Sequence, residues 1–296
     1  MYKPGAKRWV KLYREVVRTF AQAAGITIEE IPLDKNGRSD QAALIAALKG
    51  YEGKVAAVAF QTPNFFGQLE NGEEIVAAAH QNNALAIAAN TEPVAFGAIK
   101  SPGTYGADMC VGEGIGLCGA LHLGAPGVGL FATSKQFVRQ MPGRLAGQTV
   151  DSEGQRGFVL TLSTREQHIR RERATSNICT NHNLMALAFS IALSTYGKNG
   201  FIELAEENIR KTMLFRKKAL AKKLSLVFGG AHFNETVINL GDEKRAQGKL
   251  DGLARQGIMG GCLLSRWYAE FAGHVMVSTT ELHSETEMDE LIEGLI

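Results

Sequence analysis

Three groups of residues in this sequence have types and spacings that could do chemistry. The first, Gly114-Ile-Gly116-Leu-Cys-Gly119, satisfies the G-x-G-x-x-G pattern of dinucleotide-binding loops. Such a loop opens a helix and is followed by an acidic residue that holds the ribose. Here ALHLGAPGVG follows, which is not an amphipathic helix, and the acidic residue is missing. We therefore interpret these glycines as a loop packed closely against backbone, where a side chain would not fit.

The second group is a basic run that contains Arg165, Arg170, Arg171 and Arg173. The forked guanidinium group pairs well with phosphate oxygens, so this run could gather a phosphate. Charge runs of this kind are more often a solvated or ion-paired surface, and we prefer that interpretation.

The third group is a patch of small polar residues directly before an apolar helix, formed by Thr175, Ser176, Asn177, Thr180 and Asn181. Ser, Thr and Asn are preferred caps at helix N-termini. Hydroxyl and free N–H groups at a helix start also form anion sites. The two interpretations are compatible, and both stay open at this point.

The histidines and cysteines do not suggest a metal site. His168, His182 and His274 have no metal-ligand spacing, and no His–Ser–Asp constellation can be assembled from the sequence. The four cysteines contain no CxxC pair and are interpreted as reduced, structural thiols: Cys110, Cys118, Cys179 and Cys262. We predict no bound metal.

The elements that position these groups are predicted from the apolar pattern. Residues 55–60 (VAAVAF) and 85–90 (LAIAAN) are apolar without alternation, which is typical of strands covered on both faces, and a helical stretch lies between them. Strand, helix and strand form a parallel unit, whose binding sites gather at the carboxyl ends of the strands. Those ends carry QTPNFFG (61–67) and NTEPVAFG (90–97).

The remaining segments complete an α/β lobe followed by an α+β lobe. Residues 26–33 and 127–133 are predicted to be further strands, and residues 184–197 (LMALAFSIALSTYG) a buried helix ended by Gly197. We place a large α/β domain with the interdomain crossing at 1–175, and a small α+β domain at 176–296.

Bulk composition excludes several classes of protein. With 45% hydrophobic and 21% charged residues the chain is of ordinary globular type, and a net charge of +2 argues against nucleic acid or an acidic membrane as partner. No stretch is apolar for long enough to span a bilayer, and MYKPGAKRW lacks the apolar centre of a signal peptide. The predicted compartment is the cytoplasm.

Six segments together resemble one known family. The string MPGRLAGQTVDSEGQRGFVLTLSTREQHIRRERATSNICTN (141–181) closely resembles the signature of the α subunits of the P-protein family, the decarboxylating glycine dehydrogenases of the glycine cleavage system. The same family is matched, in the same order, by YREVVRTF, QTPNFFG, YGADMCVGEG, HFNETVINL and GIMGGCLL. The resemblance runs from about Tyr13 to the C-terminus.

This resemblance implies a fold, an activity and partners. The fold would be that of type I pyridoxal-phosphate-dependent transferases, the aspartate-aminotransferase architecture. Enzymes of the family decarboxylate glycine on pyridoxal phosphate and pass the aminomethyl group to the lipoyl arm of the H-protein. Their α and β chains are homologous and form an α2β2 heterotetramer, and only the β chain supplies the Schiff-base lysine.

The resemblance also indicates which half this chain is. In the catalytic half a His-Lys-Thr stretch follows the strand that corresponds to GADMCV, whereas no lysine occurs here between Lys100 and Lys135, and Gly116 lies near the lysine position. Glu92 stands where an Asp should hold the pyridine nitrogen. We therefore expect no catalytic residue and no covalently bound cofactor on this chain.

The remaining role that the resemblance implies for this chain is to contribute residues to the active site of a neighbouring subunit. In this fold the active site lies at a subunit interface, and RATSN (173–177) resembles the segment that lends groups to the partner's cofactor phosphate. Thr175 is the first candidate for that contact with pyridoxal phosphate on the β subunit, and Asn177 is the second.

The family pattern is not met at the N-terminus. Family members have a substantial region before the segment that matches Tyr13, and a His-Pro pair where Lys11-Leu12 stands. We expect a truncated gene product, a fragment or a wrongly assigned start.

Without a β subunit the chain could form a homodimer. Two other functions remain as alternatives. A self-sufficient pyridoxal-phosphate enzyme of aminotransferase type would need the missing lysine. A pure interaction scaffold would bind the β subunit or H-protein without shaping the site.

Overall fold

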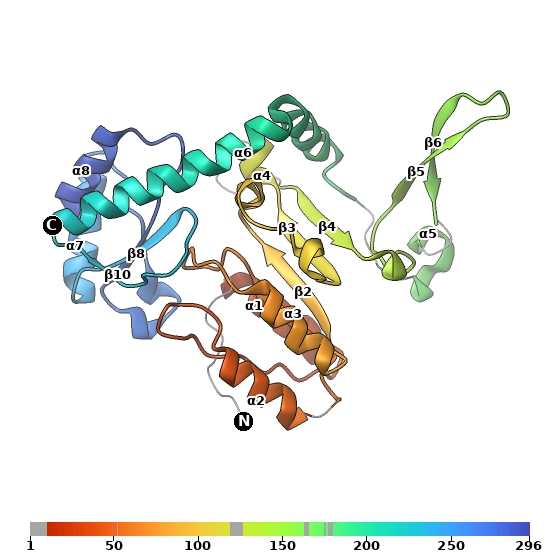
Figure 1. The fold of residues 1–296 in the computed structure, drawn as a ribbon, viewed down its shortest axis with the longest axis horizontal. Coiled ribbons are helices and arrows are strands. Elements are labelled where there is room, and N and C mark those ends of the chain that lie inside the picture. The colour runs from red at the N-terminus through yellow and green to blue at the C-terminus, as the bar shows by residue number, and fades with distance from the viewer. Residues whose placement is uncertain (1–10, 52, 119–126, 163–165, 175, 177–179) are drawn as a thin grey trace.

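The chain forms two lobes and a projecting hairpin (Figure 1). The computed structural model describes residues 11–51, 53–118, 127–162, 166–174, 176 and 180–296. We call the part built on the first sheet the large lobe. Its helices and strands are α1 (Lys11–Ala23), α2 (Gln41–Tyr51), β1 (Ala57–Gln61), α3 (Gly72–Gln81), β2 (Leu85–Asn90), β3 (Met109–Glu113), α4 (Ile115–Cys118) and β4 (Gly129–Thr133).

The large-lobe sheet has the order β1-β2-β3-β4. β1, β2 and β3 run parallel, so the predicted parallel unit is confirmed, while β4 is antiparallel to β3. Buried apolar residues from α2, α3 and both first strands form one core, among them Leu44, Phe60, Ile75 and Ala88. The carboxyl ends of three adjacent strands therefore meet at one edge of the sheet.

The strand predicted at 26–33 is wrong. The segment contains only an isolated bridge between Leu33 and Ser39, and Ile26 and Ile28 are exposed. A strand needs a neighbour for its backbone hydrogen bonds, and within the described residues β1 pairs only with β2.

The predicted crossing between the lobes contains a hairpin that the sequence did not indicate. β5 (Leu145–Val150) and β6 (Arg156–Thr161) form a separate two-stranded antiparallel sheet, followed by the short α5 (Gln167–Arg170). The Asp151 carboxylate closes the turn by accepting hydrogen bonds from the backbone N–H groups of Glu153 and Gln155, both at 2.9 Å. In Figure 1 the hairpin extends away from the body of the molecule.

A long helix, α6 (Asn183–Ala221), connects the two lobes. It is interrupted at Gly197 (φ 60°, ψ −173°), so the break predicted there is confirmed, but the chain continues as helix afterwards. The first half was predicted to be buried, and this is wrong for one face: Leu184, Leu187 and Ile191 are each more than half exposed. Only the face with Phe189 packs on the large lobe, because no other described element lies against the helix there.

The small lobe consists of the second half of α6 and a second sheet of order β7-β8-β10-β9. Its other elements are β7 (Ser225–Leu226), β8 (Glu235–Asn239), α7 (Glu243–Arg255), β9 (Cys262–Leu263), β10 (His274–Ser278) and α8 (Glu285–Leu295). The core between sheet and helices includes Phe215, Leu253, Val275 and Ile292. The two sheets lie on either side of the predicted boundary at 175/176, and that boundary stays a prediction.

The lobes are held together by a segment that follows β1. Phe66 is fully buried, and its ring centroid lies 5.3 Å from that of Phe228 and 5.2 Å from that of Phe271 in the small lobe. Just beyond, Gly67 O accepts a hydrogen bond from Phe233 N, and Leu69 N donates to Ala231 O, both at 2.8 Å. Aromatic packing and backbone pairing thus set the position of one lobe on the other.

Neither a membrane-spanning helix nor a paired cysteine occurs among the described residues. None of the described helices combines the length and apolar character needed to cross a membrane. Of the four cysteines, Cys110, Cys118 and Cys262 are free thiols, and Cys179 lies outside the described residues.

We expect Phe66→Ala to lower the free energy of unfolding by about 3–5 kcal/mol, because it removes a fully buried ring from the contact between the lobes. Phe20→Ala is the matched control, since Phe20 is largely exposed, and it should cost no more than about 0.5 kcal/mol. Denaturant unfolding followed by circular dichroism measures both. Equal losses for the two variants would contradict the role given to Phe66.

Candidate functional site

The candidate site lies at the carboxyl edge of the large-lobe sheet. Asn90 Nδ2 donates to Thr62 O at 2.9 Å, and Gln61 Nε2 donates to Thr91 Oγ1 at 3.2 Å. Both amide side chains are only 1% exposed, so these bonds replace water and tie the ends of β1 and β2 together. Asn90 Oδ1 is buried and has no hydrogen-bond partner within the described part of the chain.

Glu113, at the end of β3, organises the glycine-rich segment. Its Oε1 accepts hydrogen bonds from Ile115 N at 2.9 Å and from Val128 N at 2.8 Å. One carboxylate oxygen therefore joins the residues on both sides of positions 119–126, which lie outside the described residues.

The glycine pattern is closely packed at one of its three positions. A Cβ on Gly114 would come within 2.8 Å of the Phe189 ring of α6, so the packing there is against a side chain and not against backbone as predicted. Gly116 has room for a side chain, and Gly119 lies outside the described residues. Just before the pattern, a Cβ on Gly112 would lie 2.5 Å from the backbone oxygen of Asn90. The prediction that a side chain would not fit is therefore confirmed at Gly114 and wrong at Gly116.

The structure brings together Gly116 and Glu92, the two positions singled out by the resemblance. A Cβ atom on Gly116 would lie 3.9 Å from Glu92 Oε1, and the described residues show no closer contact there. Glu92 Oε1 accepts from Val94 N, and Glu92 Oε2 accepts from Asn234 Nδ2 of the small lobe, each at 3.3 Å. The carboxylate is thus held by both lobes.

Burial is the largest influence on the pKa values of the two carboxyl groups here, Glu92 and Glu235. It raises the pKa of Glu92, and the charge of nearby Glu281 raises it further. Burial raises the pKa of Glu235 to about 8, with a smaller contribution from the charge of Glu92. Glu235 Oε2 is buried and has no hydrogen-bond partner among the described residues. Glu235 is therefore mainly neutral at pH 7.

These residues do not fit a covalently held pyridoxal phosphate. The chain has no lysine from position 101 to 134, and Gly116 offers no amine beside Glu92. The Glu92 carboxylate, which stands where an acid should hold the pyridine nitrogen, already accepts hydrogen bonds from Val94 N and Asn234 Nδ2. We assign no catalytic step to this chain.

The other predicted site residues lie elsewhere. Thr175, Asn177 and Arg165 fall outside the described residues. Arg170, Arg171 and Arg173 are exposed, which agrees with a solvated surface. The cap position of α6 is occupied by His182, whose side chain makes no capping bond, so capping by Thr180 or Asn181 is wrong. Among the described residues no group of three or more His, Cys, Asp or Glu side chains could hold a metal ion.

Sequence reasoning missed the part that the small lobe plays. Asn234 and Glu235 stand at the start of a strand otherwise rich in apolar residues, HFNETVINL (232–240). A polar pair inside such a run signals buried polar contacts, but it does not identify the partner, which here is Glu92.

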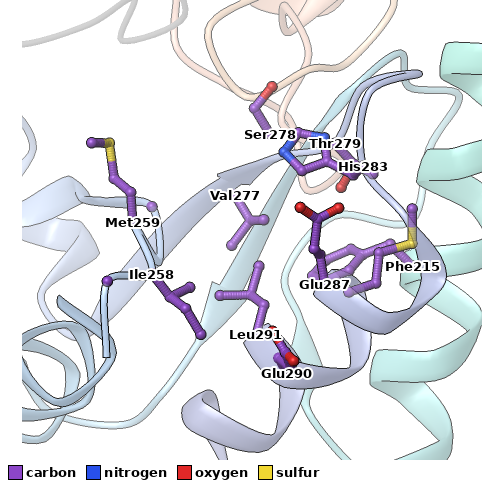
Figure 2. Close-up of a pocket in the computed structure, with 13 residues that line it drawn as sticks. Phe215, Ile258, Met259, Val277, Ser278, Thr279, His283, Glu287, Glu290 and Leu291 are labelled. Atoms are coloured by element: carbon purple, nitrogen blue, oxygen red, sulfur yellow. The ribbon is translucent and has the colours of Figure 1, made fainter. Parts of the chain in front are cut away.

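A pocket lies in the small lobe, apart from this edge, and its volume is about 340 Å³. Figure 2 shows residues that line it, from α8 and from the loop at 257–261. Two of its polar side chains have local partners: Glu287 Oε2 accepts from Ser284 N at 2.7 Å, and His283 Nδ1 accepts from Thr280 N at 3.0 Å. It shares no lining residue with the Glu92–Gly116 contact.

Comparisons with known proteins agree with this geometry. Residues 6–295 match the family described as glycine cleavage system P-protein. The chain is 44% identical over 283 residues to the probable glycine dehydrogenase (decarboxylating) subunit 1 of Geobacillus kaustophilus (strain HTA426), a match that covers 96% of this chain and 62% of that protein. The chain thus spans less than two thirds of that relative.

Solved structures confirm the predicted fold, that of type I pyridoxal-phosphate-dependent transferases. A crystal structure of glycine decarboxylase (P-protein) of the glycine cleavage system, in inhibitor-bound form, superposes with a TM-score of 0.87 at 35% identity, over 98% of this chain and 64% of that one. A NifS-like protein superposes with a TM-score of 0.66 at 14% identity, over 98% of this chain and 73% of its own, and shares the fold alone.

The buried carboxyl of Glu235 should make stability depend on pH. Its pKa is about 8 in the folded chain against 4.5 for the ordinary group, so the folded state keeps a proton that the unfolded state releases. The stabilising contribution is complete below about pH 4.5 and is lost as the pH rises towards 8. Glu235→Gln stays neutral, so its Tm should fall less between about pH 6 and pH 8 than that of the wild type.

Differential scanning calorimetry across this range measures the effect. Glu74→Gln, at an exposed position of α3, is the control and should follow the wild-type curve. A Glu235→Gln curve parallel to the wild type would overturn the assignment of a neutral buried carboxyl.

Proposed function

Because the chain belongs to the glycine cleavage system P-protein family, we propose that it is the non-catalytic α subunit of a decarboxylating glycine dehydrogenase. With a β subunit it would decarboxylate glycine and transfer the aminomethyl group to the lipoyl group of the H-protein. One observation carries this proposal. At the edge of the sheet where a catalytic half needs an amine, Gly116 stands beside Glu92 and offers none.

The cofactor belongs to the β subunit in this proposal. Pyridoxal phosphate supplies an electron sink for decarboxylation when it is bound. This chain contributes Thr175 and, second to it, Asn177 as hydrogen-bond donors to the cofactor phosphate across the subunit interface. The assembly is an α2β2 heterotetramer in the cytoplasm, and a homodimer is the form of the chain without its partner.

Two alternatives are less well supported. A self-sufficient aminotransferase-like enzyme needs a lysine that positions 101–134 do not contain. A pure scaffold would hold the partner without affecting its cofactor, and the Thr175 variant described below separates it from the proposed role.

Cofactor loading tests the division of labour. After the mixed complex has been incubated with pyridoxal phosphate and reduced with borohydride, intact-mass spectrometry should find the pyridoxyl group on the β subunit and none on this chain, which has no amine at Gly116. Stoichiometric labelling of this chain at a single lysine would contradict the proposal.

Thr175→Val should weaken retention of pyridoxal phosphate by the assembled complex roughly tenfold, since one hydrogen bond to a charged group is lost. Assembly should be unchanged on size-exclusion chromatography, and Thr180→Val, at an exposed position nearby, should retain wild-type affinity. Unchanged cofactor affinity in Thr175→Val would remove this residue from the site and favour the scaffold.

A further inference from the structure

The β5–β6 hairpin lacks the support that such an element needs. Its strands pair only with each other, and within the described structure neither packs extensively on another helix or strand (Figure 1). A lone two-stranded hairpin is at best marginally stable in water. We therefore expect the hairpin to pack against another protein surface in the functional assembly.

One face of the hairpin is suited to such a cover. Residues opposite each other in the register share a face, and the pairs Gln148–Phe158 and Ala146–Leu160 therefore lie on the same side. The large apolar residues of this face, Val150, Phe158 and Leu160, are 64, 67 and 63% exposed. The face also carries Arg156, opposite Val150, with its guanidinium carbon 5.8 Å from the centroid of the Phe158 ring. We call it the arm face.

The opposite face of the hairpin exposes less apolar side chain. It carries Gly147 and Gly157, and its exposed large apolar residue is Val159. Alternation along β6 directs Val159 away from Phe158 and Leu160. Val159 thus provides a control position within the same strand.

A second unpartnered apolar surface lies on the first half of α6. Leu184, Leu187 and Ile191 are spaced three and four residues apart, so they form one stripe, and positions 183–196 contain no charged residue. A surface that covers this stripe must itself be uncharged and apolar.

The two surfaces together suit the centre of a subunit interface. Their six large apolar side chains are each more than half exposed. An interface of standard size buries about 800 Å² on each partner, with a few anchor residues at its centre. In the chain the two surfaces flank the segment 173–177, which holds the proposed phosphate contacts. An interface that uses both would bring that segment to the partner.

We propose that the β5–β6 hairpin is a docking arm whose Val150–Phe158–Leu160 face is buried against the β subunit, with the α6 stripe as the second part of the same interface. The inference rests on the proposed function, since the relatives carry the name of one subunit among several. The polar turn at Asp151 stays in solvent at the tip of the arm.

Binding of a purified β subunit to the full chain, measured by isothermal titration calorimetry, tests this proposal. Phe158→Ala/Leu160→Ala should weaken binding at least tenfold, because buried apolar anchors carry most of the energy of an interface. Val159→Ala should bind within about twofold of the wild type, since its side chain lies on the other face. All chains should keep the same circular dichroism spectrum, because these residues are exposed in the chain alone.

The possible results distinguish failure of the docking-arm proposal from failure of the proposed function. Wild-type affinity in the double variant, or an equal loss in Val159→Ala, overturns the arm face while the proposed function stands. No binding by the wild type overturns the function and the arm together. A wild-type homodimer that the same double variant dissociates, without loss of β binding, would assign the arm to a second copy and overturn our choice of partner.

Discussion

The contact between the two lobes, made by the segment after β1, is the constraint on which the rest of the structure depends. Phe66 is enclosed by rings of the small lobe, and the backbone of Gly67 and Leu69 pairs with residues 231–233. This pairing places Asn234 opposite Glu92 and buries Glu235 beside it. It acts together with α6, which packs on elements of both lobes, to fix the position of one sheet relative to the other.

At that edge the fold of type I pyridoxal-phosphate-dependent transferases is present without an amine beside Glu92. The strand ends are tied by Asn90 and Gln61, and the glycine-rich segment is closed by Glu113. Yet Gly116 leaves no amine beside Glu92, and Glu92 itself bonds to the small lobe. Glu92 is a contact between the lobes. In the proposed function, a chain of this kind contributes shape and surfaces to an assembly.

The sequence predicted those elements whose cause is local. The strands at 55–60 and 85–90 follow from apolar runs without alternation, and the break at Gly197 follows from a residue that tolerates positive φ. Gly116 and Glu92 were each singled out by the family resemblance, and the structure places them next to each other.

Features set by distant or missing neighbours could not be predicted. Asn234 lies 142 residues from Glu92 in the chain, and nothing near either residue indicates the other. The first half of α6 is uncharged and mostly apolar, a pattern that predicts burial without telling which molecule covers the helix. The hairpin was missed because its strands contain glycines and expose apolar residues, so neither shows the alternation of a half-buried strand.

The central claim is that this chain takes part in glycine decarboxylation only as the companion of a catalytic subunit. Glycine–bicarbonate exchange in the presence of H-protein and pyridoxal phosphate tests it most directly, with this chain alone, the β subunit alone and the two together. The account predicts no exchange by this chain alone and full exchange only by the mixture. Exchange by this chain alone, or exchange by the β subunit that the chain does not increase, would contradict it.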